Sequence, residues 1–189
     1  MELQCISALL LFLALCVMMP FELFISVFLS AAVHELGHLA ALWAFGAKTE
    51  KVSPSFCGIT ITFYGTRSYL QDALCAFIGP AAGIVFSLKS ALFAKIYGHD
   101  VFYTMCGASM SLSLFNLLPA MPLDGGRILF SLLAWKKGIQ SAQRALYVST
   151  AASSVFLILM GVFALTVSSS GITFILVGAW LCANGCKNF

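Results

Sequence analysis

The chain has 189 residues, of which 61% are hydrophobic and only 9% are charged, and its formal net charge is +3. Soluble domains carry about 25% charged residues, so this composition excludes an ordinary soluble protein and favours a helical membrane protein. The basic residues are dispersed between apolar runs, and we therefore expect no nucleic-acid partner. The seven cysteines include no C-x-x-C pair, so they are interpreted as small apolar side chains rather than as disulfides or a metal cluster.

Six apolar segments approach or exceed the length of about 20 residues that a helix needs to cross a bilayer. The expected spans are residues 3–19, 21–45, 70–94, 101–135 with a break near 119–123, 146–167 and 172–186, with a polar link over 136–144. The first segment lacks a basic leader and a clear cleavage site, which favours a retained span over a signal peptide. The predicted fold is an all-α polytopic membrane protein with six transmembrane helices, forming a single domain over residues 1–189.

Residues 48–69 interrupt the helical pattern between spans two and three. Pro54 breaks the helical pattern in this segment. The stretch Gly58–Tyr64 alternates in polarity and is rich in β-branched residues. We therefore expect a short β-hairpin at the membrane surface. The strand that contains Ile59 and Ile61 either covers the helices or pairs with an extended substrate segment, and the sequence leaves both interpretations open.

The most informative residues lie in the second span, which contains His34-Glu35-Leu36-Gly37-His38. Two histidines four residues apart lie on one helical face, so both rings can reach one metal ion. This H-E-x-x-H pattern is typical of zinc hydrolases, in which the glutamate is the general base. Ionisable groups are costly in an apolar span, so a merely structural pair of polar residues is the weaker interpretation.

A catalytic zinc ion commonly takes a third protein ligand, and the sequence offers few candidates. Asp72 and Asp100 lie near loops, and His99 lies in a polar loop where a solvated side chain is expected. Asp124 follows two prolines in the interrupted stretch 116–127, and broken backbone at membrane depth indicates a cavity. A ligand role for Asp124 is favoured over the alternative that it is a helix N-cap.

Positive charge is concentrated on one side of the predicted spans. The loops after spans two and four contain Lys48, Lys51, Arg67, Lys136, Lys137 and Arg144. The opposite side has only Lys89 and Lys95, so the positive-inside rule predicts a multi-pass cell-membrane protein with both termini in the cytoplasm. In this orientation His34, His38 and Asp124 lie at one depth, toward the cytoplasm.

HELGH in one span, followed by N-x-x-P-x-x-P-L-D-G-G in a later span, resembles the site-2 protease family of intramembrane zinc metalloproteases. The six-span plan is most similar to the branch that cleaves membrane-tethered sporulation transcription-factor precursors. The resemblance implies a single zinc ion held by His34, His38 and Asp124, with Glu35 as the catalytic acid and base. It also implies that Asn116 binds the substrate or stabilises the oxyanion.

The same resemblance implies a substrate-positioning role for Gly79, Gly83 and the surface strand. Close helix packing is the favoured interpretation of the two glycines on their own, because small residues four apart let helices approach each other. The implied partners are a membrane-embedded or membrane-tethered protein substrate, the lipid bilayer and, as a further expectation, a regulatory membrane protein. The chain ends soon after span six, so we expect no C-terminal nucleotide-sensing domain.

A membrane zinc transporter is the main alternative function, because some carriers also place His–Glu pairs in a span. A carrier is expected to line its path with further His or Asp ligands, whereas the remaining His99 lies in a loop. A zincin that takes a downstream glutamate as third ligand is disfavoured, because no Glu follows Glu50. An inactive scaffold is disfavoured because every motif residue is present.

Overall fold

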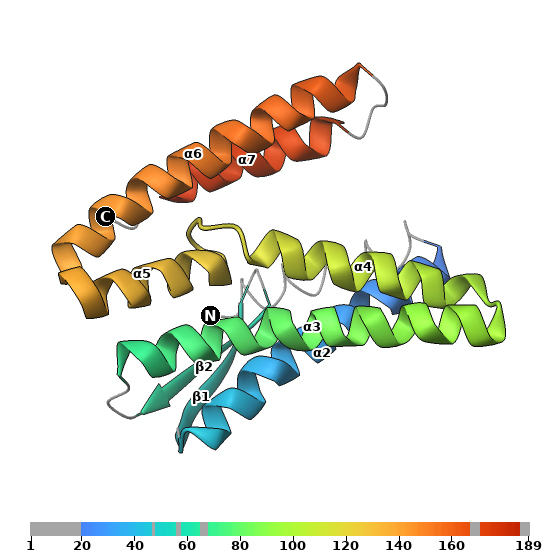
Figure 1. The fold of residues 1–189 in the computed structure, drawn as a ribbon, viewed down its shortest axis with the longest axis horizontal. Coiled ribbons are helices and arrows are strands. Elements are labelled where there is room, and N and C mark those ends of the chain that lie inside the picture. The colour runs from blue at the N-terminus through green and yellow to red at the C-terminus, as the bar shows by residue number, and fades with distance from the viewer. Residues whose placement is uncertain (1–19, 47, 56–57, 65–67, 167–170, 186–189) are drawn as a thin grey trace. The chain divides into compact units, whose positions relative to one another are not determined.

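The computed structural model describes residues 20–46, 48–55, 58–64, 68–166 and 171–185 (Figure 1). The elements are α2 (Phe21–Ala44), β1 (Lys48–Ser55), β2 (Gly58–Tyr64), α3 (Tyr69–Tyr97), α4 (Asp100–Asn116), α5 (Asp124–Lys137), α6 (Ile139–Leu165) and α7 (Gly171–Gly185). Among the described residues, α2, α3 and α6 are long and apolar enough to cross a membrane, and α7 is shorter and apolar. The expected first span, 3–19, lies outside the described residues.

The start of α6 differs from the prediction. The segment 136–144 was expected to be a polar link, but α5 continues to Lys137 and α6 begins at Ile139. Gly138 alone makes the turn, at φ +83°, a conformation that glycine adopts without the steric cost of a Cβ atom. The residues that follow are polar, yet Gln, Ala and Arg are good helix formers, so polarity was a poor guide to where the helix starts.

The chain divides into two compact units. Unit 1 contains Met1–Arg67 and Ala81–Ser113, and unit 2 contains Ser68–Pro80 and Leu114–Phe189. The boundary inside α3 therefore falls directly after Pro80. A proline within a helix lacks the N–H that would bond to the carbonyl four residues earlier, so the helical hydrogen-bond ladder is interrupted at this boundary.

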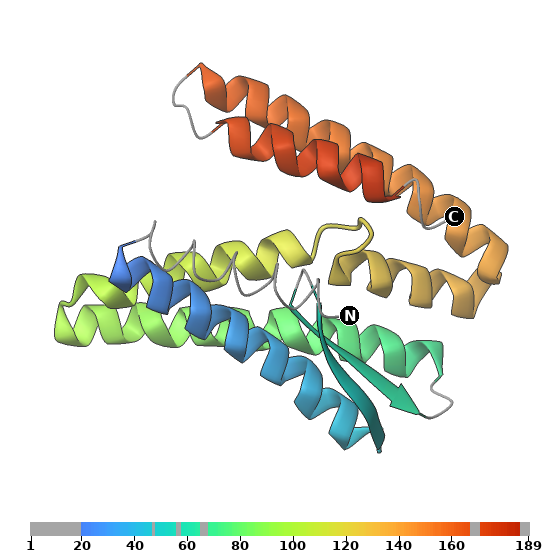
Figure 2. The same cartoon turned by 180° about the vertical axis from the view of Figure 1, so that it is seen from behind.

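Small residues bring α3 and α4 together within unit 1, where the two helices lie side by side (Figure 2). Ser109 Oγ donates a hydrogen bond to the Gly83 carbonyl at 2.8 Å, and Ser87 Oγ donates to the Cys106 carbonyl, also at 2.8 Å. A Cβ atom at Gly83 would collide with Ser113 Oγ. Gly83 therefore has the close-packing role that its spacing indicated.

Strands β1 and β2 form an antiparallel two-stranded sheet in unit 1. Their register runs from Lys48 opposite Tyr64 to Ser55 opposite Gly58, with an irregularity between Thr49 and Lys51. The alternating segment is thus extended and paired in the structure. Its location at the membrane surface and its pairing with a substrate stay predictions.

Unit 2 is built around the antiparallel pair α6 and α7 and the turn that precedes α5. Ala120 and Leu123 from this turn pack with Leu157 of α6 and Leu181 of α7 in one buried cluster. The Met121 N–H donates to Thr150 Oγ1 at 3.2 Å, which attaches the turn to α6. The interrupted stretch between α4 and α5 is therefore a packed element of unit 2.

The contact at Gly83 predicts the outcome of a paired substitution. Gly83→Ala is expected to destabilise the protein by about 0.5–1.5 kcal/mol, because the Ser113 hydroxyl must leave its present rotamer, and Ser113→Ala in the same chain is expected to restore most of that loss. Thermal unfolding in detergent measures both effects. Gly107→Ala on α4 is the control, because no atom lies within 4 Å of the added Cβ. Equal stability of Gly83→Ala and wild type would contradict the packing account.

Candidate metal centre

A single buried stripe of α2 positions the first candidate ligand. Ser26, Ser30, His34, Gly37 and Ala41 are buried and recur every three or four residues, which is the period of one helical face. Ser26 Oγ and Ser30 Oγ each donate to the backbone carbonyl four residues earlier, at 2.7 Å. These serines satisfy their hydroxyl groups within the helix, so the imidazole is the polar side chain that this stripe presents to a ligand.

The His34 and His38 rings face each other one turn apart in unit 1. His34 is only 4% exposed and His38 is half-buried. Their Nε2 atoms are 3.2 Å apart, and the ring planes are nearly perpendicular at 82°. Two nitrogens bound to a tetrahedral zinc at about 2.0–2.1 Å would lie roughly 3.3–3.4 Å apart. The observed Nε2–Nε2 distance is therefore within about 0.2 Å of the separation that a tetrahedral zinc ion requires.

Glu35 lies one residue after His34 and is exposed. A step of one residue turns its side chain by about 100° around the helix axis, away from the buried stripe. The glutamate is therefore next to the imidazole pair in sequence and lies on the outer surface of α2. A general base at a metal site must lie within reach of the water molecule from which it takes a proton.

Asp124 is the first residue of α5 in unit 2 and is 9% exposed. Leu123, with extended backbone, occupies the N-cap position, so the alternative interpretation of Asp124 as the N-cap is wrong. Asp124 Oδ1 lies 3.8 Å from Nη1 of Arg127, one turn further along α5. Arg127 was not predicted as a site residue, although its i,i+3 spacing from an aspartate is a recognisable signal for an ion pair.

The two glycines after Asp124 explain why this carboxylate can be held in a buried turn. A Cβ atom at Gly125 would collide with the Leu117 and Leu118 carbonyl oxygens, and one at Gly126 would lie 2.6 Å from the Ala120 carbonyl group. The backbone that precedes α5 thus folds directly against the first turn of the helix. Only glycine fits at either position without moving this backbone.

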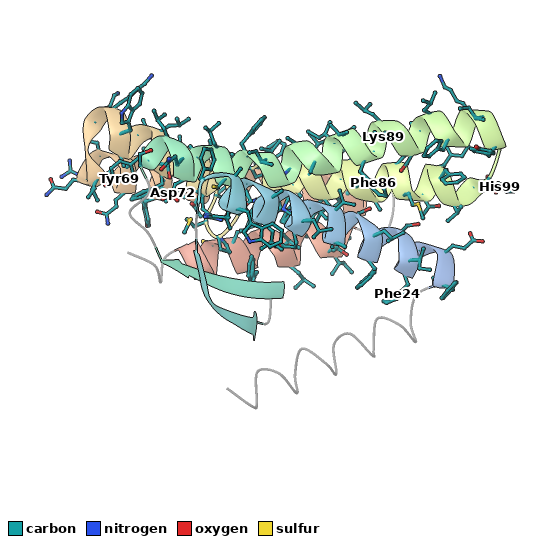
Figure 3. All side chains as sticks on the ribbon, turned by 90° about the horizontal axis from the view of Figure 1, so that it is seen from below. Phe24, Tyr69, Asp72, Phe86, Lys89 and His99 are labelled. Carbon is teal, nitrogen blue, oxygen red and sulfur yellow. The ribbon has the colours of Figure 1, made fainter. Side chains whose placement is uncertain are left out.

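The other predicted site residues have varied environments. Asn116 is the last residue of α4 and is half-buried, and Gly79 is buried in α3. Ile59 and Ile61 are on β2. His99 is exposed at the turn between α3 and α4, as expected for a solvated histidine (Figure 3).

Sequence and structure comparisons relate the chain to known proteases. Residues 82–160 match Peptidase family M50. A zinc metalloprotease of Methanocaldococcus jannaschii is 35% identical over 121 residues, which are 61% of this chain and 35% of that protein. The solved site-2 protease from Methanocaldococcus jannaschii matches with a TM-score of 0.69 at 25% identity, covering 97% of this chain and 86% of that chain. The chain thus resembles peptidase family M50 over these residues and a solved site-2 protease in its fold.

A further relative is stage IV sporulation protein FB of Bacillus subtilis, which is 28% identical over 139 residues, or 71% of this chain and 47% of that protein. The chain thus spans 35% to 47% of the length of these two relatives. The resemblance to site-2 proteases predicted from the two motifs is confirmed. The match to Peptidase family M50 and the apolar helices together indicate a membrane protein.

If the two imidazoles bind one metal ion, removing either imidazole should weaken metal binding. His38→Gln is expected to lower the zinc affinity of the purified protein at least about 100-fold, because it removes one of two facing ring nitrogens. Metal analysis after dialysis against a graded zinc buffer measures the change. His99→Gln is the matched control and should bind zinc as the wild type does. Unchanged zinc binding by His38→Gln would rule out the pair as a metal site.

Proposed function

We propose that this chain is an intramembrane zinc metalloprotease. Its reaction is hydrolysis of a peptide bond in or near a transmembrane segment of a membrane-tethered protein, such as a transcription-factor precursor. The observation that supports this function most strongly is the Nε2–Nε2 distance of 3.2 Å between His34 and His38, within an H-E-x-x-H motif on a helix long enough to span a membrane. The M50 relationship supports the same reaction class.

We propose that His34, His38 and Asp124 hold the zinc ion. The donor set of two imidazoles and one carboxylate is a common one for catalytic zinc and leaves a position open for water. The contact of Asp124 with Arg127 is compatible with this role, because a carboxylate that binds a metal ion usually has an outer partner as well. When bound, zinc supplies a Lewis acid that activates water near neutral pH and polarises the scissile carbonyl.

The protein side chains then have distinct tasks in the proposed reaction. Glu35 accepts a proton from the attacking water and returns it to the leaving amine. Asn116 binds the substrate and donates its amide N–H to the oxyanion that develops on the scissile carbonyl. The position of Glu35 directly after His34 supports its role, because the H-E-x-x-H spacing places a general base beside the metal ion.

A helical substrate hides its carbonyl groups in backbone hydrogen bonds, so the cleaved segment must be extended before hydrolysis. We propose that the β2 edge around Ile59 and Ile61 pairs with this segment, and that Gly79 helps to position it. Gly83 contributes indirectly, through the packing of α3 against α4. The charge bias of the loops supports an orientation with both termini in the cytoplasm.

Glu35→Gln tests the proposed reaction. Reconstituted with a membrane-tethered substrate, this variant is expected to lose cleavage by about 100-fold to 10,000-fold, the usual contribution of a general acid–base, while keeping its zinc. Glu22→Gln, on the first turn of the same helix, is the matched control and should cleave normally. Full cleavage by Glu35→Gln would contradict the mechanism, and zinc uptake into vesicles without proteolysis would favour a transporter.

Asp124→Asn tests the third ligand. This substitution keeps the size of the side chain and removes its negative charge, so zinc affinity is expected to fall by about 10–100-fold or more. Competition with a zinc chelator measures the affinity. Asp100→Asn is the control, because Asp100 is also in the first turn of a helix but is exposed. Equal zinc affinity of Asp124→Asn and wild type would remove Asp124 from the site.

A further inference from the structure

The corner between α5 and α6 in unit 2 is basic (Figure 1). Lys136 and Lys137 end α5, Gly138 makes the turn, and Arg144 follows in the second turn of α6. All three basic side chains are exposed. The corner therefore presents three cations to its surroundings.

The acidic residues of the chain do not neutralise this corner. No Asp or Glu follows Asp124 in the sequence. The acidic residues of unit 2 are Asp72 and Asp124, and Asp124 is paired with Arg127. Asp72 lines a separate cavity, which Arg127 and Gln143 also line. Among the described residues, none of the three cations of the corner forms an ion pair, so the corner keeps a surplus of positive charge.

The length of α6 fixes the level of this corner in a membrane. α6 is long and apolar enough to cross a bilayer. After Arg144 it has no charged residue up to its end at Leu165, and this part is about 30 Å long at 1.5 Å per residue, which is the thickness of the hydrocarbon core. A charge is costly in the hydrocarbon, so Arg144 lies at its edge when α6 crosses. The turn at Gly138 then lies further out, with both lysines beside it.

Two exposed aromatic rings support the same level. Trp135 is 54% exposed and Tyr147 is 50% exposed. Lys136 Nζ lies 5.9 Å from the centroid of the Trp135 ring, in a cation–π contact. Tryptophan and tyrosine are enriched where the apolar layer meets the lipid headgroups. The basic and aromatic residues of the corner therefore lie where phosphate groups of lipids are found.

A hollow of about 500 Å³ lies against α6 at this level, lined by Gln143, Arg144, Tyr147 and Val148. Val148 is one turn after Arg144, toward the apolar part of the helix, and is 65% exposed. The hollow thus changes from cationic to apolar in the direction of the membrane centre. A phospholipid has its phosphate and its acyl carbons in this same order. A free phosphate or an acidic protein segment would leave the apolar part of the hollow unfilled.

We propose that this hollow binds a phospholipid with a net negative charge, of the phosphatidylglycerol class. Arg144 binds the phosphate through its guanidinium, and the Gln143 amide donates a hydrogen bond to a phosphate oxygen. The first acyl carbons lie against the Tyr147 ring and Val148. The two lysines of the corner raise the local positive potential, which favours an anionic lipid over a zwitterionic one.

Native mass spectrometry of the full chain, titrated with lipids of identical acyl chains, tests this site. The wild type is expected to bind phosphatidylglycerol about tenfold more tightly than phosphatidylcholine. Arg144→Gln should lower the affinity for phosphatidylglycerol about tenfold and leave that for phosphatidylcholine unchanged, whereas Arg144→Lys keeps the charge and should lose less. Lys136→Gln combined with Lys137→Gln should also lower the affinity for phosphatidylglycerol several-fold.

Lys95→Gln is the matched control. Lys95 is an exposed cation in the last turn of α3, which is also long and apolar enough to cross a membrane. This variant loses the same charge as Arg144→Gln but lies in another helix, and it should bind phosphatidylglycerol as the wild type does. Thermal unfolding verifies that each variant is folded.

Three results would overturn the proposal. The first is equal affinity of the wild type for the two lipids, and the second is an equal loss in Arg144→Gln and Lys95→Gln, which would show a response to net charge alone. The third is competition by glycerophosphoglycerol as strong as that of the lipid, which would identify a soluble phosphate ester instead. If Arg144→Gln does not fold, the double lysine variant decides, and its unchanged binding of phosphatidylglycerol would contradict the proposal.

Discussion

The fixed separation between the His34 and His38 rings is the constraint on which the proposed chemistry depends. One helical turn sets the Nε2–Nε2 distance at 3.2 Å, and the serines before them on the same face bond to the helix backbone. At this distance one ring can donate a hydrogen bond to the other when its proton is on Nε2, and a cation bound by two deprotonated Nε2 atoms would replace that hydrogen bond with coordination. In both cases the two nitrogens are directed at the same point, so the pair is well suited to hold a metal ion.

A second constraint is the backbone that leads into α5. The residues between α4 and α5 fold so closely against the first turn of α5 that Gly125 and Gly126 have no room for a Cβ atom. Ala120 and Leu123 anchor this turn in the core of unit 2, and Thr150 accepts a hydrogen bond from it. An irregular backbone is thus stabilised by protein packing, which is the condition for such a segment at membrane depth. The rigid turn explains how a carboxylate can be buried at Asp124.

Local patterns predicted the helical elements and the paired histidines well, because both depend on residues close in sequence. The H-E-x-x-H spacing alone placed His34 and His38 on one face, and the small residues around Gly83 indicated close packing. The helical start at Ile139 was not predicted, since the turn at Gly138 takes one residue where a polar link was expected. The N-cap at Leu123 instead of Asp124 depends on how the turn before α5 packs against α6, which periodicity cannot report.

The central claim is that one zinc ion joins two imidazoles and the Asp124 carboxylate. A crystal structure of the zinc-loaded protein, with anomalous diffraction recorded on both sides of the zinc absorption edge, tests it most directly. The account predicts one anomalous peak at about 2.0–2.2 Å from Nε2 of His34, Nε2 of His38 and an oxygen of Asp124. A peak at the two histidines with a different third protein ligand, or a peak elsewhere, would contradict it.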